Sequence, residues 1–577
     1  MAVVQTPPLQ HAPIGRLLVE QRLISADQLR ITQHEQARTG QAIGPLLVSL
    51  GFVTEHALRA AHAQACGLAE ADLARSTPDK QAQGCVPEPL ARRLGVFPLS
   101  WDATRRHLEL AIARPDDLVI TDQLAAQLPQ GVLVTLRVAG EDEIRQAIER
   151  HYGHKEDLGA LVAHLERAAT EPLAPGREAP PSQAAVHLVD AVLQDAVRRE
   201  ASDIHFEPER HLLRIRYRID GLLREILSLH APAWPALAVR LKVMADIDIA
   251  ENRSPQDGRI SQVIGGRPID FRVSTLPTLH GENIVLRILD RQRRLMPLAG
   301  LGLAPTQLAR LRIMIARPEG LLVFTGPTGS GKTTTLYSIL HQLDAARLNI
   351  MTLEDPVEYP LPGIRQSTIS EESRLGFAEG VRAMMRQDPD VILIGEIRDA
   401  ETASMALRAA MTGHQVHATL HSGSALGTLV RLQELGVRPD ILAGNLIGAV
   451  AQRLVRRLCP HCREPRMPTA TERELLDETG TTTLFDATGC PLCDGQGYRG
   501  RLALMEILRM NAELDELVAA GASRHALKRA ARAGGCVSLV EDGLRAVRAG
   551  LTTLEELGRV VDLTERQHAM PDMAAVE

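Results

Sequence analysis

A glycine-rich segment in the second half of the chain places the tightest constraint on its fold. Residues 326–333 read GPTGSGKT, which fits the phosphate-binding-loop pattern G-x-x-x-x-G-K-[ST] in full. A short apolar, β-rich run at 321–324 precedes this loop, and helix-forming sequence follows it. Between a strand and a helix, the backbone N–H groups of such a loop and the positive end of the helix attract phosphate. The sequence therefore predicts an α/β domain with a parallel sheet and a nucleotide-phosphate site.

We expect the loop to bind ATP through its backbone and to use two side chains for specific tasks. Lys332 is expected to reach the β- and γ-phosphates, and the Thr333 hydroxyl is expected to bind Mg²⁺. Further along, the apolar run 391–394 is a buried-type strand that is followed by Glu396. An acid at that strand end holds Mg²⁺ in phosphate-loop enzymes, usually through water, so we assign this role to Glu396. The expected nucleotide-binding residues are Gly326, Pro327, Thr328, Gly329, Ser330, Gly331, Lys332, Thr333 and Thr334.

A second acidic segment is a candidate source of the catalytic base. The strand-like run 350–353 leads into the sequence EDPVE, which begins with Glu354 and ends with Glu358. A carboxylate beside the γ-phosphate can orient and polarise the attacking water. Spacing alone leaves both glutamates as candidates for this role.

Three histidines, His414, His417 and His421, lie close together in a segment that reads as a strand leading into a loop. A cluster of this kind is expected either to sense the γ-phosphate or to make structural hydrogen bonds, since a lone histidine is more often structural. The sequence alone leaves both interpretations open.

Two C-x-x-C pairs near the end of the domain predict a metal site. They are Cys459 with Cys462, and Cys490 with Cys493. Four thiolates with this paired spacing are typical ligands of a tetrahedral structural Zn²⁺ site, which has no open position for catalysis. The intervening segment 463–489 is somewhat longer than in a common zinc ribbon. The three remaining cysteines are isolated, and we expect them to be small core residues.

Length, charge and composition narrow the class of protein further. The 577 residues predict three to four domains. A net charge of -6 and only 2% aromatic residues argue against a nucleic-acid-binding protein. The amino-terminal residues lack the basic and apolar regions of a secretory signal, and no apolar run is long enough to span a bilayer. We therefore expect a cytoplasmic protein that reaches a membrane only through partners.

The chain before the phosphate loop divides into several parts. Residues 14–24 resemble residues 43–53, and each copy continues into an amphipathic helix with Ser25 or Thr54 as its N-cap. A Pro-rich, non-periodic stretch near residue 175 indicates a linker. The expected order is a disordered lead (1–12), an N-terminal docking domain (13–153, with a helical repeat at 13–68 and an α+β part at 69–153), a linker (154–183), an α+β domain (184–290), the ATPase domain (296–510, with a zinc element at 459–493) and a helical subdomain (511–577).

Taken together, these motifs resemble those of the secretion and pilus-assembly ATPases, which include the type II secretion ATPase and the type IV pilus extension ATPase. The further segments that match are ASDIHFEP (201–208), PQDGR (255–259), RVSTLP (272–277) and GYRGR (497–501). The resemblance implies a RecA-like core preceded by a PAS-like domain and a mainly helical N-terminal domain. It also implies a homo-hexameric cytoplasmic motor at the inner membrane, which acts with a platform protein and an adaptor in pseudopilus or pilus assembly.

The resemblance implies roles for individual residues as well. In the family the last acid of the EDPVE segment is catalytic, which favours Glu358, and His414 and His421 match the two histidine positions of the family. Other matching residues are arginines that reach the nucleotide from the preceding domain or from the helix before the Glu396 strand. An arginine on a second domain makes closure over ATP sensitive to the γ-phosphate, so hydrolysis releases the clamp and drives a rotation. These arginines are Arg272, Arg287, Arg382 and Arg386.

Two alternatives belong to other functional classes. The tandem repeat resembles a module through which some relatives bind cyclic di-GMP, but that module normally has Arg-Leu-Gly where this chain has Pro13-Ile14-Gly15 and Ala42-Ile43-Gly44. Without these arginines we expect a docking domain, and a cyclic-di-GMP-gated scaffold is the alternative. A DNA-uptake or DNA-transfer ATPase of the same superfamily is a third interpretation, which the acidic composition weakens.

Overall fold

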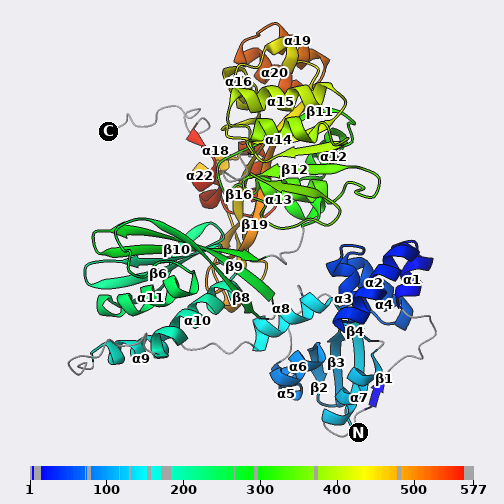
Figure 1. Ribbon diagram of the computed structural model, residues 1–577, viewed down its shortest axis with the longest axis vertical. Coiled ribbons are helices and arrows are strands. Elements are labelled where there is room, and N and C mark those ends of the chain that lie inside the picture. Colours follow the sequence, from blue (N-terminus) through cyan, green and yellow to red (C-terminus); the bar gives the residue numbers. More distant parts are fainter. Residues whose placement is uncertain are drawn as a thin grey trace. The chain divides into compact units, whose positions relative to one another are not determined.

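The chain forms two compact units in the computed structural model. One unit comprises residues 1–219 and 223–290, and the other comprises residues 220–222 and 291–577 (Figure 1). The described residues are 3–5, 14–71, 73, 80–115, 117–128, 131–152, 158–170, 183–265, 267–290, 296–369, 375–476 and 482–564. Every helix among them is too short or too polar to span a bilayer.

The first unit begins with the tandem repeat, which folds as two pairs of helices. Ser25 and Thr54 cap the second helix of each pair through their side chains, as the sequence predicts. Leu18 and Leu47 occupy equivalent positions in the two copies, and both are fully buried in a small shared core. The four helices are α1 (Ile14–Glu20), α2 (Ala26–Thr39), α3 (Ile43–Ser49) and α4 (Glu55–Cys66).

The same unit contains a four-stranded sheet in the order β1-β4-β3-β2. Its first strand, β1, spans Val3–Gln5 and pairs in parallel with β4. The prediction of a disordered lead is therefore wrong for these three residues, because two β-branched valines extend the edge of a sheet; residues 6–13 lie outside the described residues. The other elements are α5 (Lys80–Cys85), α6 (Glu88–Leu94), β2 (Val96–Asp102), β3 (His107–Ile112), α7 (Leu118–Gln127), β4 (Leu133–Val138) and α8 (Glu141–Tyr152).

The second part of this unit is a six-stranded antiparallel sheet in the order β7-β6-β5-β10-β9-β8. Helix α9 (Leu158–Thr170) packs on α10, and its Leu165 is buried in the core of this part. The predicted linker over 154–183 is therefore wrong for α9, whereas residues 154–157 and 171–182 lie outside the described residues. The other elements are α10 (Gln183–Arg198), β5 (Asp203–Pro208), β6 (Leu212–Ile219), β7 (Leu222–His230), α11 (Trp234–Met244), β8 (Gln256–Ile264), β9 (Arg267–Thr278) and β10 (Gly281–Asp290).

A seven-stranded sheet in the order β13-β12-β14-β15-β11-β16-β19 forms the centre of the second unit. All adjacent pairs are parallel except β16 with β19. Alternate residues of β11 face separate cores, one with α12 and α13 and the other with α14, α15 and α16 (Figure 1). The strands are β11 (Gly320–Thr325), β12 (Ile350–Glu354), β13 (Arg365–Thr368), β14 (Val391–Ile394), β15 (Gln415–Leu420), β16 (Leu446–Leu458) and β19 (Tyr498–Arg509). The helices are α12 (Pro305–Ile315), α13 (Lys332–Leu340), α14 (Phe377–Met384), α15 (Ala400–Met411) and α16 (Ala425–Glu434).

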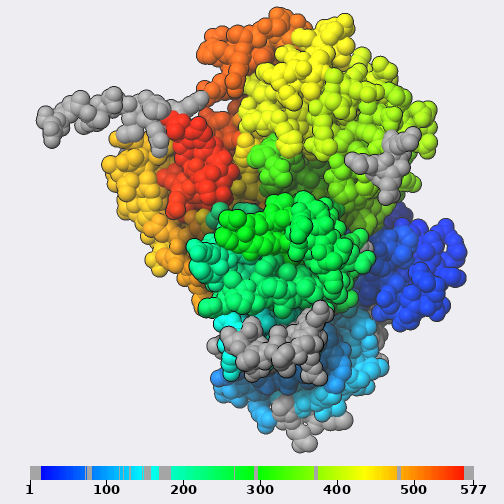
Figure 2. Space-filling view, turned by 60° about the vertical axis from the view of Figure 1, so that its left-hand side comes forward, coloured from blue at the N-terminus to red at the C-terminus, as the bar shows by residue number. Residues whose placement is uncertain are grey.

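Two smaller parts are attached to this sheet. A two-stranded sheet, β17 (Arg463–Arg466) with β18 (Leu484–Ala487), and helix α18 (Ala470–Leu475) lie between β16 and β19 in the sequence. Four C-terminal helices share the core of α14 to α16, and α20 contacts α16. The space-filling view shows the orange C-terminal segment directly against the yellow one (Figure 2). The four helices are α19 (Ala512–Ala519), α20 (Arg524–Ala533), α21 (Leu539–Arg548) and α22 (Leu554–Val560).

Candidate active site

Four neighbouring strands of the seven-stranded sheet deliver the predicted chemical groups to one edge. Strands β12, β14, β15 and β11 are parallel, so their carboxyl ends lie on the same side of the sheet. In open parallel sheets, ligands bind at this edge. The phosphate loop follows β11, the EDPVE segment begins at the end of β12, Glu396 follows β14 and His421 follows β15.

The phosphate loop lies between a fully buried strand and a helix, as the sequence predicts. Strand β11 is buried throughout, and α13 begins at Lys332. The Nζ of Lys332 donates hydrogen bonds to the carbonyls of Gly326, at 2.7 Å, and Pro327, at 3.1 Å. Burial lowers the pKa of Lys332, and the Glu396 carboxylate opposes this effect. Thr333 is an exposed residue in the first turn of α13.

Gln452 of β16 holds the loop from the other side, and no local sequence signal marks it. Its Nε2 donates to the carbonyl of Ser330 at 2.8 Å, and its Oε1 accepts from the Thr335 hydroxyl at 2.9 Å. Gly326 has a φ of 151°, and a Cβ at this position would lie 2.5 Å from the carbonyl oxygen of Gln452. Only glycine fits this close approach of the loop to the backbone of β16.

Glu396 lies at the centre of a group of charged side chains. Its carboxylate forms an ion pair with Arg398, and the Nε2 of His421 is 3.5 Å from its Oε2. Arg398 also forms an ion pair with Asp355 of the EDPVE segment, at 3.1 Å. Two of the expected site residues, Glu396 and His421, are thus brought together. Arg398 was not among the expected residues, although it lies only two positions after Glu396.

The three histidines are separated by strand β15. His414 precedes the strand, and its Nδ1 contacts the carbonyl of Ala409 at 2.9 Å. His417 is completely buried within the strand, where desolvation lowers its pKa to about 4 and keeps it neutral. His421 follows the strand at the phosphate-loop edge. Because six residues of strand span about 20 Å, the structure brings His421 and not His414 to this edge within one chain.

The structure distinguishes the two candidate bases. Glu354 is 4% exposed and accepts hydrogen bonds from the Tyr337 hydroxyl, from the Thr352 hydroxyl at 2.5 Å and from the Gln366 amide at 3.3 Å. Burial raises the pKa of Glu354. Glu358 is exposed, so its carboxylate is free to meet water. The environment of Glu354 is that of a structural acid, which supports Glu358 as the base.

We expect Glu358→Gln to reduce turnover about 10²- to 10⁴-fold with little change in KM, because the variant keeps the shape of the side chain but not the base. Glu354→Gln is the matched comparison: it should lower thermal stability and change kcat much less. Steady-state phosphate release and thermal unfolding of both variants measure the two effects. A larger loss of kcat in Glu354→Gln than in Glu358→Gln would reverse the assignment.

Of the two expected arginines near α14, one has a partner on α15 and the other has a partner within α14. The Nη2 of Arg382 donates to Glu401 of α15 at 3.1 Å, and the Nη1 of Arg386 donates to the carbonyl of Arg382 at 3.0 Å. Both arginines are exposed, so their guanidinium groups remain accessible. Their contact with nucleotide stays a prediction.

The two expected arginines of the six-stranded sheet lie opposite each other on adjacent strands. Arg272 of β9 is the cross-strand partner of Arg287 of β10 and of Arg259 of β8. Arg287 forms an ion pair with Asp203 at 3.0 Å, and Arg259 forms one with Asp270 at 2.8 Å. Like charges directly opposite each other destabilise a sheet. The two aspartates offset part of the repulsion within this exposed row of arginines, and the positive charge that remains is suited to binding an anion.

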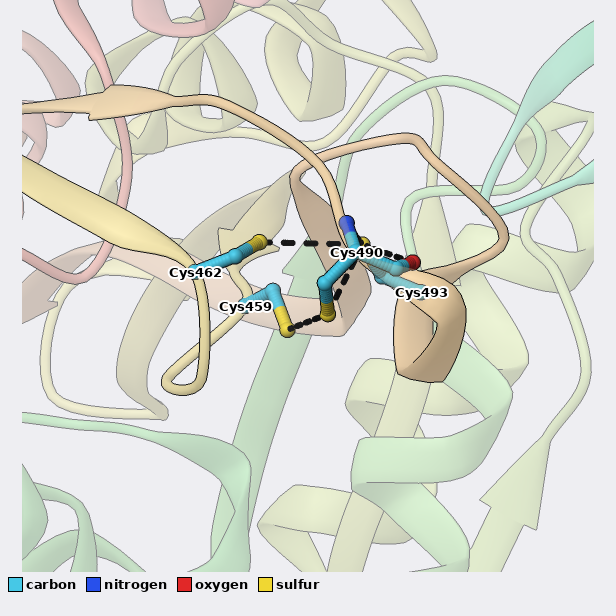
Figure 3. A group of neighbouring side chains, drawn as sticks. All are labelled: Cys459, Cys462, Cys490 and Cys493. Carbon is cyan, nitrogen blue, oxygen red and sulfur yellow. Dashed lines mark hydrogen bonds between the residues drawn. The ribbon is translucent and has the colours of Figure 1, made fainter.

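The four cysteines of the two C-x-x-C pairs form a cluster, as the sequence predicts (Figure 3). All four Sγ atoms lie within 4.8 Å of one another. The distances are 3.9 Å between Cys459 and Cys490, 3.7 Å between Cys462 and Cys493, and 3.8 Å between Cys490 and Cys493. A tetrahedral Zn²⁺ with Zn–S bonds of about 2.3 Å separates its sulfurs by about 3.8 Å. The cluster therefore has the right size for this ion.

The backbone around Cys493 favours the thiolate form, which is the form that binds metal. The amides of Cys490 and Gly497 each donate a hydrogen bond to the Cys493 Sγ at 3.2 Å. Although burial raises the pKa of this thiol, the amides outweigh burial and lower the pKa to about 7. The donor set and its geometry fit a structural metal ion with four thiolate ligands.

Comparison with known proteins places this geometry in context. The family profile described as type II/IV secretion system protein matches residues 178–559, which is more than half of the chain. A second profile, the MshEN domain, matches residues 66–158. The two matches together cover most of the described chain.

Individual relatives match over most of their own length. The type IV pilus assembly ATPase PilB of Myxococcus xanthus is 40% identical over 558 residues, which cover 94% of this chain and 98% of the relative. The type II secretion system ATPase E of Vibrio cholerae is 43% identical over 420 residues, or 72% of this chain and 82% of the relative. A crystal structure of the pilus retraction motor PilT with bound ADP is 25% identical, with a TM-score of 0.46, and covers 67% of this chain and 97% of that chain.

Proposed function

The chain belongs to the type II/IV secretion system protein family and is an ATPase of that family, and we propose that it is the motor that assembles a pilus or a pseudopilus. The observation that carries this proposal is the convergence of the phosphate loop, Glu396, Asp355 and His421 at one edge of a parallel sheet. Type II secretion and pilus extension share these motifs, so the proposal includes both machines.

Each group at the site has a task in hydrolysis. Lys332 and the loop amides bind the β- and γ-phosphates, and Glu358 orients the attacking water. Thr333 and Glu396 would hold Mg²⁺, which would neutralise charge on the phosphate oxygens. His421 lies beside Glu396, so substitution of either residue is expected to alter the position of the other side chain. The four arginines expected to bind the nucleotide are Arg272, Arg287, Arg382 and Arg386.

The assembly and the location of the chain are part of the same proposal. We propose a homo-hexamer in the cytoplasm that is held at the inner membrane by a platform protein and an adaptor. Support comes from the pilus and secretion ATPases among the relatives and from the lack of a helix able to span a bilayer in the described part of the chain. We further propose that the cysteine cluster holds Zn²⁺ as a structural ion, supported by the sulfur distances.

The test is steady-state phosphate release by the purified full chain with ATP and Mg²⁺, measured with and without the platform protein. Lys332→Ala is the reference variant, because it removes the cation that binds the β- and γ-phosphates. We expect the unmodified chain to hydrolyse ATP and Lys332→Ala to release no phosphate above background. Equal phosphate release by both proteins, with the platform protein present, contradicts it.

The N-terminal repeat provides a separate prediction. We expect no binding heat when cyclic di-GMP is titrated into the full chain, because proline and alanine stand where the cyclic-di-GMP module has arginines that pair with phosphate. Restoring the motif as Ala42→Arg is the informative comparison, since Ala42 caps α3 without a side-chain hydrogen bond. Micromolar binding by the unmodified chain would instead support a cyclic-di-GMP-gated motor.

A further inference from the structure

Strand β16 runs beside the phosphate-loop strand and continues past it. The last residue of β11, Thr325, pairs with Ala451. The next two residues of β16, Gln452 and Arg453, therefore lie alongside the phosphate loop. Gln452 fixes the loop through the Ser330 carbonyl, as described above. This rigid contact gives Arg453 a defined position next to the loop.

The guanidinium group of Arg453 lies between the phosphate loop and the segment that follows His421. Its Nη1 donates to the carbonyl of Gln452 at 3.0 Å and would be 3.2 Å from a Cβ on Gly326. Its Nη2 donates to the carbonyl of Gly423 at 3.4 Å, and Gly423 is only two residues beyond His421. One side chain thus reaches both segments that border the phosphate site.

Arg453 has no counter-charge of its own. Among the residues that the structure describes, no carboxylate lies within ion-pair distance of its guanidinium. Burial lowers the pKa of Arg453, and the charge of Glu506 only partly opposes this effect. Arg453 also lies close enough to Lys332 for its charge to lower the pKa of that ammonium group, in addition to burial. Two half-buried cations at one loop are unfavourable until an anion joins them.

We propose that Arg453 contacts the phosphates of the bound nucleotide and is a second cation of the phosphate site, supplied by the same chain from β16. This inference rests on the proposed ATPase function. A guanidinium group has five N–H donors in a planar fork that matches phosphate oxygens, and only two of its bonds are made to carbonyls here. A triphosphate adds negative charge beside both cations, which Glu396 at Lys332 and Glu506 at Arg453 compensate only in part.

The test compares Arg453→Gln and Arg453→Lys with the unmodified full chain. Arg457→Gln is the control, because Arg457 is an exposed residue on the same strand. Two probes are used: a non-hydrolysable ATP analogue and inorganic tripolyphosphate, which lacks base and ribose. Arg453→Gln is expected to bind both probes about ten- to a hundredfold more weakly, the loss typical of a hydrogen-bonded charge. Arg453→Lys keeps the charge but loses the planar fork of donors, so its affinity for both probes should lie between those of Arg453→Gln and the unmodified chain. The affinity of the control variant should match that of the unmodified chain.

Two results overturn the inference. Binding of both probes by Arg453→Gln within twofold of the unmodified chain excludes a phosphate contact. A loss for the ATP analogue alone, with tripolyphosphate binding unchanged, places Arg453 at the base or ribose instead. Thermal unfolding confirms that each variant is folded. The proposed function fails separately, if the unmodified chain releases phosphate no faster than Lys332→Ala.

Discussion

A Glu396→Gln variant is expected to bind ATP as tightly as the unmodified chain and to hydrolyse it at least about a hundredfold more slowly. The substitution keeps the size of the side chain at the end of β14 and removes its negative charge. In the proposed mechanism that charge would help to hold Mg²⁺, and in the structure it forms the ion pair with Arg398 and faces His421. The loss therefore falls on kcat rather than on KM. Steady-state phosphate release and equilibrium binding of ATP measure the two quantities.

A matched control separates this effect from a general loss of charge. Glu434→Gln alters an exposed glutamate of α16 that pairs with Arg431 at 2.9 Å, and it should leave both quantities unchanged. Phosphate release by Glu396→Gln within a few-fold of the unmodified rate would show that another acid holds the metal. Weaker ATP binding with unchanged kcat would place Glu396 in ground-state binding only.

Protein purified without added metal is expected to contain close to one Zn²⁺ per chain, and Cys462→Ser is expected to lose it. Structural zinc contributes on the order of 10 kcal/mol to the folding of small zinc domains, so its removal should unfold the element between β16 and β19. That element comprises β17, α18 and β18, and its two ends are joined at the cysteine cluster. Metal analysis and thermal unfolding are the measurements.

Cys536→Ser is the control for the metal prediction, because this half-buried thiol lies outside the cluster. It should leave the zinc content unchanged. A zinc-to-chain ratio near zero in the unmodified protein, together with free titration of all four thiols, would reject the site. Loss of zinc without any change in unfolding would show that the ion binds but does not stabilise the element.

The parts of the site that could be predicted are those in which one short segment carries its own chemistry. The phosphate loop, the strand before Glu396 and the two cysteine pairs each have a local pattern that is typical of one kind of site. The arrangement of the phosphate loop and Glu396 at one sheet edge also follows from the sequence, since alternating strands and helices give a parallel sheet whose strand ends meet. The choice of Glu358 over Glu354 required the family resemblance, and the buried hydrogen bonds of Glu354 now give it a physical reason.

The contacts that could not be predicted join distant segments. Gln452 and Ser330 are 122 positions apart, and only the pairing of β11 with β16 brings them together. The position of His414 depends on where β15 begins, which motif spacing does not reveal. Helix α9 was not predicted, because the Pro-rich sequence that follows it indicates a linker. Its apolar face nevertheless has the spacing of a buried helix.

The packing of α9 has a mechanical consequence for the amino-terminal domain. Because α8 ends at Tyr152 and α9 begins at Leu158, the tether between the two domains has six Cα steps and reaches at most about 20 Å. The linker expected over residues 154–183 would have allowed a much larger separation between the two domains. The short connection therefore limits how far the amino-terminal domain can separate from the domain that contains α9.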